Sequence, residues 1–208
     1  MINEELKKYI EENIFKENNK NDIGHNMEHV SYVINRSLRF AEEIADININ
    51  MVYVVAAYHD IGHHIDAKNH EVVSSIIFLK DLEMRKYFSV DEIKIISEAI
   101  LDHRASNDFE PRSIYGKIVS SADRNTSLDE PLKRTYQYTL KHCPGLSIDE
   151  MVDRAYNHLS QKYGQEGYAK EKMYFKDDEY EAFLKDLGSL LKDKEKFRKK
   201  YILINKIK

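Results

Sequence analysis

Histidine is the residue type whose placement in this sequence is most informative about chemistry. Seven of the nine histidines lie between His25 and His103, and this part of the chain includes the adjacent pair His59-Asp60. Imidazole is the commonest metal ligand in proteins and titrates near neutral pH. This part of the chain is therefore where we look for a metal site or an acid–base site.

The candidate ligands share the apolar faces of expected helices. Residues three or four apart lie on the same face of a helix, and His29, His59 and His103 each stand at such an interval from aliphatic residues. Asp60 follows His59 at a helix end, rotated from it by about 100°. Buried polar groups of this kind need partners, which one or two divalent cations would supply. The inward-facing candidates, on five helices, are His29, His59, Asp60, His70, His103 and Asp123.

A single histidine on an apolar face has a simpler interpretation, a hydrogen-bonded residue of the core. For the whole set the metal site is favoured, because an acid beside a histidine at the end of an apolar helix, as at His59-Asp60, has no structural advantage. Nitrogen and oxygen ligands without thiolate suit Mn²⁺, Fe²⁺, Co²⁺, Ni²⁺ or Zn²⁺. Mg²⁺ is a further candidate, and the number of ions is one or two.

Helical periodicity extends through the whole sequence. Glycine and proline are rare, and the alternation typical of half-buried strands is absent. Asn26 is expected to cap one helix, and Ser89 and Ser147 to open two more through capping boxes. Pro111 is expected in the first turn of a helix that ends near Asp123. The helices are expected over about 27–45, 51–60, 69–82, 89–103 and 111–123, from about 129, over 147–163, and from about 178 into the tail.

These patterns predict an all-α fold in one compact domain over 1–208. Its motif-bearing core would span about 22–127, and additional helices about 128–208 would form a C-terminal extension. Gly62 is expected to end the second long helix as a C-terminal glycine. In the third, the residues expected to face inward are Val72, Val73, Ile76, Ile77 and Phe78.

Composition limits the classes of protein. With 42% hydrophobic residues the chain can bury a sizeable core, and a net charge of −4 neither favours nor excludes nucleic acid. The one cysteine, Cys143, excludes an intramolecular disulfide and fits a reducing compartment. Neither a signal peptide in residues 1–20 nor a run of eighteen apolar residues is found. The sequence therefore predicts a cytoplasmic protein without a membrane role.

Three short motifs occur in order along the first 127 residues. They are Glu28-His29-Val30-Ser31-Tyr32-Val33, Ala56-Ala57-Tyr58-His59-Asp60-Ile61-Gly62-His63 and Ser120-Ser121-Ala122-Asp123-Arg124. Their order and surroundings resemble those of the HD superfamily of metal-dependent phosphohydrolases, over about residues 22–127. The resemblance implies an HD-type helical domain.

The resemblance also implies a ligand set. His29, His59, Asp60 and Asp123 would hold a first metal ion. In some branches of the superfamily two further histidines bind a second ion, and His70 and His103 occupy matching places here. In that version Asp60 would bridge both ions.

Several side chains around these ligands are candidates for catalysis and substrate binding. Asp60 could also orient or deprotonate the attacking water, and His25 could contact phosphate or act as an acid. Many relatives have a lysine after the glycine of the second motif; here His63 and His64 stand there and could protonate the leaving oxygen. One of these two is also open to interpretation as an exposed residue. Candidates for clamping phosphate, each of which has an alternative structural interpretation, are Lys68, Arg104 and Arg124.

The resulting functional hypothesis is hydrolysis of a phosphoester or phosphoanhydride bond in a nucleotide or small phosphorylated metabolite. Two alternatives are a mixed-valent di-iron oxygenase on the same ligands and a non-catalytic nucleotide sensor. The expected partner is a small phosphorylated substrate; nucleic acid has little support, and oligomerisation stays open. Tyrosines concentrated in the C-terminal third are expected to pack that region, although one could line a nucleoside pocket.

Overall fold

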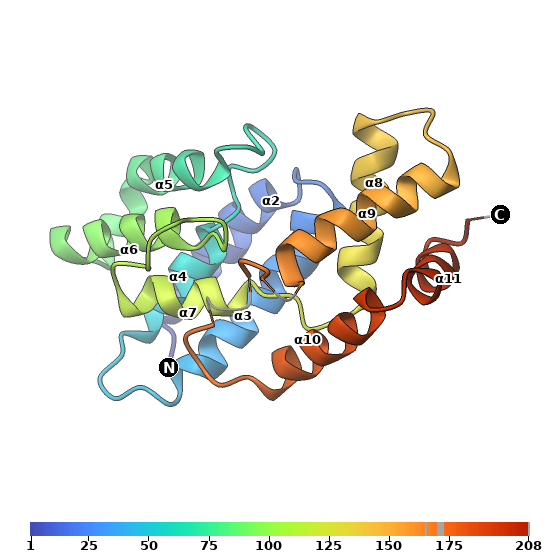
Figure 1. Ribbon diagram of the computed structural model, residues 1–208. Helices are drawn as coiled ribbons and strands as arrows, with labels where there is room; N and C mark the ends of the chain where they lie inside the picture. Colours follow the sequence, from blue (N-terminus) through green and yellow to red (C-terminus); the bar gives the residue numbers. More distant parts are fainter. Residues whose placement is uncertain (165, 170–172, 208) are drawn as a thin grey trace. The chain divides into compact units, whose positions relative to one another are not determined.

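The computed structural model describes residues 1–164, 166–169 and 173–207. Over these ranges the regular structure is helical and no strand occurs, so the all-α prediction is confirmed (Figure 1). The chain divides into two compact units. The first comprises 1–123 with 173–175, and the second comprises the remaining residues from Arg124 onward.

The first unit is built around α4 (Ile49–Tyr58). Every residue of α4 from Met51 to Tyr58 is buried, as expected for a helix that is apolar on all sides. It packs against α3, α5, α6 and α7, as well as against the N-terminal helices. These neighbours are α3 (Met27–Ala41), α5 (His70–Lys80), α6 (Val90–Asp102) and α7 (Ile114–Ala122), with a short 3₁₀ helix at Leu82–Lys86.

The N-terminal segment forms a nearly continuous helix that covers α4. It consists of α1 (Glu4–Tyr9), a π-helical turn (Ile10–Ile14) and α2 (Phe15–Asn18). Its apolar side is buried, and at its end the amide of Asn18 donates to the Ala57 carbonyl at 3.0 Å. That bond fixes the C-terminal end of α4 against the N-terminal segment.

Helix starts in the first unit follow the expected capping chemistry. The side chain of Asn26 accepts from the backbone N–H groups of Glu28 and His29, which sets the first turn of α3. Ser89 opens α6 through a capping box with Glu92. Both predicted caps are confirmed.

The predicted start of α7 at Pro111 is wrong. The helix begins at Ile114, and Ser113 is its cap. The reason lies in Arg112, the residue before the cap. Its backbone N–H donates to the buried carboxylate of Asp102 at 2.9 Å, and its guanidinium pairs with the same carboxylate. This ion pair holds the connection outside the helix.

The predicted inward face of α5 is wrong in two positions, because Val72 and Ile76 are both 44% exposed. Small polar residues face inward instead. Ser74 accepts from the N–H of Gly62 at 3.0 Å, and Ser75 donates to the Ser97 carbonyl at 3.1 Å. Their size lets α5 approach its neighbours closely.

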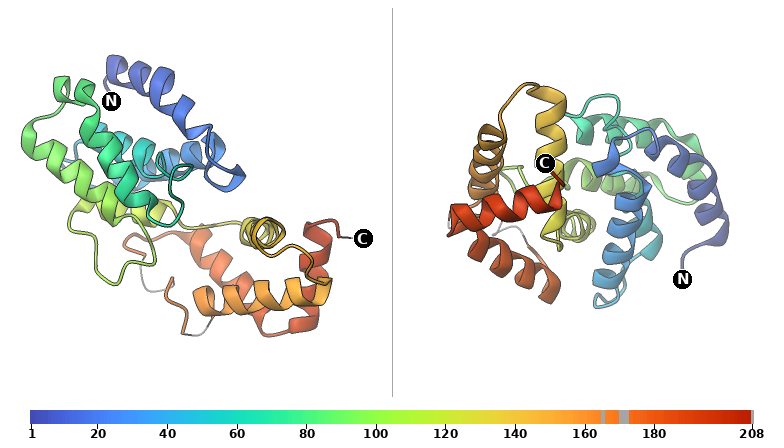
Figure 2. Two further views of the ribbon diagram at one scale, coloured as in Figure 1. Left: turned by 90° about the horizontal axis from the view of Figure 1, so that it is seen from above. Right: turned by 90° about the vertical axis from the view of Figure 1, so that its right-hand side faces the viewer.

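Among its described residues the second unit contains four helices, seen in red, orange and yellow in Figure 2. They are α8 (Asp129–His142), α9 (Ile148–Tyr163), α10 (Asp178–Leu191) and α11 (Lys194–Ile204). α9 packs against the other three. The capping box at Ser147 is confirmed, but the predicted single last helix is two, because the side chain of Asp193 caps the start of α11. No helix of the described ranges is both long and apolar enough to cross a membrane.

Gly62 lies in the turn after α4 and is needed for close packing. The prediction that Gly62 ends the helix is wrong, because α4 ends at Tyr58 with His59 as its C-cap; the φ of Gly62 is not positive. A Cβ at this position would lie 2.7 Å from Cβ of Val73 and 2.8 Å from the backbone N of Ser74. Any side chain here would push α5 away from the turn.

Gly62→Ala is therefore expected to destabilise the protein by about 1–3 kcal/mol through overpacking. The matched control is Gly188→Ala within α10, where a Cβ meets nothing within 4 Å. The control is expected to stabilise its helix by roughly 0.5–1 kcal/mol. Urea unfolding followed by circular dichroism measures both. Equal and small effects for the two variants would contradict the tight contact at Gly62.

Candidate metal centre

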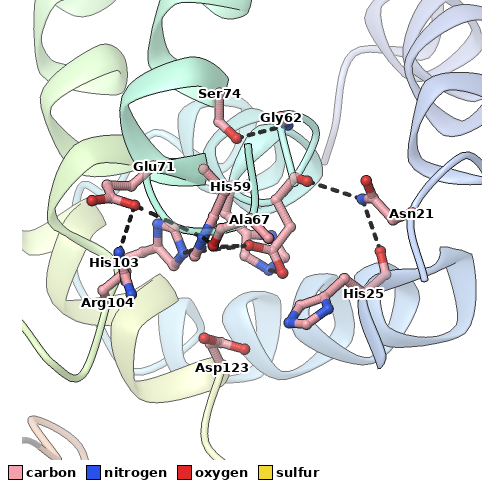
Figure 3. Close-up of polar contacts among 12 residues, drawn as sticks. Asn21, His25, His59, Gly62, Ala67, Glu71, Ser74, His103, Arg104 and Asp123 are labelled. Carbon is pink, nitrogen blue, oxygen red and sulfur yellow. Dashed lines mark hydrogen bonds and ion pairs between the residues drawn. The ribbon is translucent and has the colours of Figure 1, made fainter. Parts of the chain in front are cut away.

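Five helix ends meet at one place in the first unit, and each presents a histidine or an aspartate. Three of these residues, His59, His103 and Asp123, are labelled in Figure 3. His29 lies in the first turn of α3, and His70 is the first residue of α5. Asp60 follows the C-cap residue of α4. The helix ends of α4, α6 and α7 each place a C-cap residue in the cluster, namely His59, His103 and Asp123.

The first group of ligand atoms comes from His29, His59 and Asp123. The Nε2 atom of His29 lies 3.1 Å from Oδ1 of Asp123 and 3.3 Å from Nε2 of His59. His59 is fully buried, and the other two side chains are largely so. Three potential donors therefore face a common point.

The second group comes from Asp60, His70 and His103. The two imidazoles approach through Nε2 at 3.2 Å, and Nε2 of His70 lies 3.1 Å from Oδ1 of Asp60. All three residues are buried. This is a second set of three donors around its own point.

Asp60 faces both groups, with one carboxylate oxygen toward each. Its Oδ2 lies 3.2 Å from Nε2 of His59 and 3.4 Å from Nε2 of His29. Its Oδ1 faces His70 and also lies 3.5 Å from Nε2 of His103. A carboxylate so placed could bridge two cations.

The donor separations fit divalent cations. Donors held at about 2.1 Å from an ion lie roughly 3.0–3.4 Å apart in octahedral or tetrahedral geometry, close to the observed spacings. The ring tautomers fit as well, because Nδ1 of His59 donates to the Ala56 carbonyl at 2.8 Å and Nδ1 of His103 to the Ile100 carbonyl at 2.7 Å. His70 does the same with Ala67 at 3.1 Å. In each ring Nε2 is thereby left as a ligand atom directed at the cluster.

The electrostatics of the cluster also favour positive charge. Burial opposes ionisation of Asp60, but the charge of His59 and hydrogen bonds from His103 and His29 hold the pKa of Asp60 well below its usual range. Burial likewise opposes protonation of His59, yet the Asp60 carboxylate outweighs it and raises the pKa of His59 to about 9. The two aspartates thus hold protons on neighbouring imidazoles, and a bound cation would replace those protons.

The other candidate catalytic residues take different positions. His25 belongs to a 3₁₀ turn (Ile23–His25) before α3, and its ring extends toward the cluster (Figure 3). It stacks on His63, with ring centres 3.6 Å apart. His64 is exposed and contacts Asn21 through Nδ1 at 3.2 Å. Of the two neighbouring histidines, His63 is therefore the one that borders the cluster.

The three candidate phosphate clamps are not equivalent. Arg104 donates to Glu71 at 2.9 Å and to the Lys68 carbonyl at 2.8 Å, so its guanidinium is already engaged. The side chain of Lys68 is exposed. Arg124 is buried and belongs to the second unit. The pair of Arg104 with Glu71 connects the ends of α5 and α6, which carry His70 and His103.

Two residues at the site carry no recognisable signal in the sequence. Asn21 is buried and donates to the carbonyls of Asp60 at 2.9 Å and His25 at 3.0 Å (Figure 3). Its Oδ1 accepts from the N–H of His64 at 2.9 Å. Asp22 lies 2.7 Å from Nδ1 of His25, and this bond lowers the pKa of Asp22 to about 2. An Asn-Asp pair at a turn is commonplace, and only the folded chain reveals these contacts.

The fold and the cluster together define an all-α protein with a histidine–aspartate centre suited to divalent cations. Residues 26–127 match the family model described as HD domain. This match agrees with the resemblance inferred from the three motifs, which is confirmed. Proteins of this family are generally metal-dependent phosphohydrolases. No curated protein and no solved structure matched the chain.

Asn21→Ala is expected to weaken metal binding by about tenfold. The substitution removes the side chain that bonds the backbone of the turn carrying Asp60, so this turn is no longer held in place. The control is Asn13→Ala on the exposed side of the N-terminal helix, where the side chain donates to the Tyr9 carbonyl. Titration of the metal-free proteins with Mn²⁺ measures the affinities. The same affinity for both variants would show that Asn21 does not position the centre.

Proposed function

We propose that this protein is a hydrolase that holds two divalent metal ions and cleaves a phosphoester or phosphoanhydride bond in a nucleotide or small phosphorylated metabolite. The observation that carries the proposal is the position of the Asp60 carboxylate, whose two oxygens face two separate groups of potential metal ligands. Two-metal centres of this kind are common in enzymes that displace groups at phosphorus. The match of 26–127 to the HD domain model supports the same class of reaction.

The residues divide into two ligand sets that share Asp60. His29, His59 and Asp123 would hold one ion, and His70 and His103 the other. When bound, such ions lower the pKa of a coordinated water to roughly 7 and polarise a phosphoryl oxygen. Asp60 keeps its negative charge at neutral pH because its pKa is held low, so it can accept a hydrogen bond from the attacking water and orient it.

His25 is the residue we assign to the leaving group. Its Nδ1 is bonded to Asp22, which fixes the ring and leaves Nε2 available. A proton at Nε2 would pass to the leaving oxygen as the bond to phosphorus breaks. Asp22 then acts as a positioning residue through His25.

His63 would contribute binding in its neutral form. Burial, together with the charge of His25, lowers the pKa of His63 to about 4, so the ring carries no charge at neutral pH. A neutral imidazole can donate one N–H to a phosphoryl oxygen. In this role His63 would take the place of the lysine that many relatives have after the glycine of the second motif, here Gly62.

The test is phosphate release from a panel of nucleotides and sugar phosphates in the presence of Mn²⁺. The wild-type protein is expected to release phosphate or pyrophosphate from a member of the panel. Asp60→Asn keeps the shape of the side chain but removes its charge, and is expected to lower turnover at least about 100-fold. The control is Asp91→Asn, an exposed acid in the first turn of α6, which should retain activity.

Activity of Asp60→Asn equal to that of the control would contradict the assignment of the centre. Bound iron with oxygen consumption and no phosphate release from any member of the panel would replace hydrolysis by oxygenase chemistry.

A further inference from the structure

Helix α5 carries a stripe of aliphatic side chains on its outer side. Val72 and Ile76 are each 44% exposed and Leu79 is 47% exposed. Their spacing of four and three residues places them along one face of the helix. The opposite side, with Ser74 and Phe78, is buried. The core needs only this second side, so the stripe is available for another contact.

Exposed aliphatic residues also flank the helix at both ends. Ile65, in the turn before α5, is 62% exposed, and Leu82, after the helix, is 63% exposed. Single aliphatic residues on a surface need no explanation, but a row of them on one element marks a site of interaction. Within the first unit α5 packs chiefly on α6 and lies at the edge of that unit (Figure 1). An external surface can therefore reach the stripe.

Basic side chains stand on both sides of the stripe along the chain. Lys68 precedes α5, and Lys80 is its last residue. Arg85 and Lys86 follow in the 3₁₀ helix that begins at Leu82. All four basic residues are exposed. Cations therefore flank the aliphatic residues before and after the helix.

Two acids of the same segment are directed at other parts of the protein. The Glu71 side chain is 15% exposed and pairs with Arg104 at 2.9 Å. The Asp81 carboxylate accepts hydrogen bonds from the hydroxyl groups of Tyr9, at 2.8 Å, and Tyr58. Neither carboxylate therefore offsets the charge of the outer side.

The other two acids of the segment offset only part of its positive charge. Glu83 pairs with Lys86 at 2.6 Å. Asp66 accepts from the backbone N–H groups of Lys68 and Asn69 in the turn before α5. Four exposed basic residues stand against these two acids in 65–86. The outer side of this segment is therefore net positive.

We propose that this face of α5, formed by Val72, Ile76 and Leu79 with Lys80 and Arg85, binds the surface of an anionic lipid bilayer. The aliphatic side chains enter the boundary between headgroups and acyl chains, and the cations lie at the level of the lipid phosphates. Such binding is peripheral and needs no membrane-spanning helix. It goes against the expectation from the sequence of no membrane role, which depended on the lack of a long apolar run. The site does not depend on the metal centre or on hydrolysis.

The charge of this face favours a lipid surface over a second copy of the chain. A two-fold contact between two copies places the same patch of each against the other. Lys80 and Arg85 of one copy would then face the same cations of the other, and like charges across an interface repel. The phosphates and carboxylates of an anionic bilayer neutralise them instead.

The experiment titrates the full chain with vesicles of phosphatidylcholine, alone or with about 30% phosphatidylserine, and separates bound protein by flotation. The wild-type protein is expected to bind the anionic vesicles and to be released as the salt concentration rises. Ile76→Gln is expected to weaken binding by about tenfold, because it removes aliphatic area from the contact. Lys80→Gln is expected to weaken it by about fivefold, because one charge near the bilayer is lost. Circular dichroism establishes that each variant is folded.

The matched controls lie in the second unit. Leu140→Gln removes an aliphatic side chain of α8 that is 48% exposed. Lys185→Gln removes the charge of an exposed lysine of α10. Both control variants are expected to bind the anionic vesicles as the wild-type protein does.

The proposal is refuted if the wild-type protein does not bind the anionic vesicles at low salt, or binds phosphatidylcholine alone equally well. Equal weakening of binding by Ile76→Gln and Leu140→Gln would also refute it. A dimer in light scattering that only Ile76→Gln dissociates, together with no vesicle binding, would assign the stripe to a second copy instead. Because phosphate release is not measured, failure here is distinct from failure of the proposed hydrolysis.

Discussion

The burial of one carboxylate, that of Asp60, is the constraint on which the rest of the first unit depends. An ionised carboxylate removed from water is costly unless it is surrounded by partners. Here the partners are imidazoles from His29, His59, His70 and His103, which reach it from four separate helices. No local segment can supply them, so the site exists only when those helices meet at their ends.

The scaffold meets this requirement through close packing and a few polar bonds. α4 is buried on all sides and ends at Tyr58, two residues before Asp60, so it fixes the depth of the carboxylate. Gly62 and Ser74 let α5 approach the turn that follows α4. The side chain of Asn21, from the N-terminal segment, bonds the backbone of the same turn. The ion pair of the buried Asp102 carboxylate with Arg112 anchors the connection after α6, next to His103 of the cluster. These contacts are made mostly to backbone groups, which positions the ligands without competing for their donor atoms.

Much of the helical framework could be predicted from the sequence, because its signals are local. Caps at Asn26, Ser89 and Ser147 depend on bonds within four residues, and all three are confirmed. The cluster could be located because a histidine or acid on an apolar face is detectable at helical spacing. Whether these residues bind metal stays a prediction.

The wrong predictions depend on distant contacts. The face of α5 was not predictable, since Val72 and Ile76 are more apolar than the serines that pack inward. Proline is common in the first turn of a helix, so Pro111 was expected to start α7. The bonds between Arg112 and Asp102 keep this residue outside the helix. Asn21 acts on residues 39 and 43 positions away, and no pattern in the sequence records such bonds.

Anomalous diffraction from crystals grown with Mn²⁺ tests the two-ion centre most directly. We expect two peaks in the first unit, one bounded by His29, His59 and Asp123 and the other by His70 and His103, with a carboxylate oxygen of Asp60 against each. A single peak, or none, with all six side chains ordered would contradict a bridging role for Asp60.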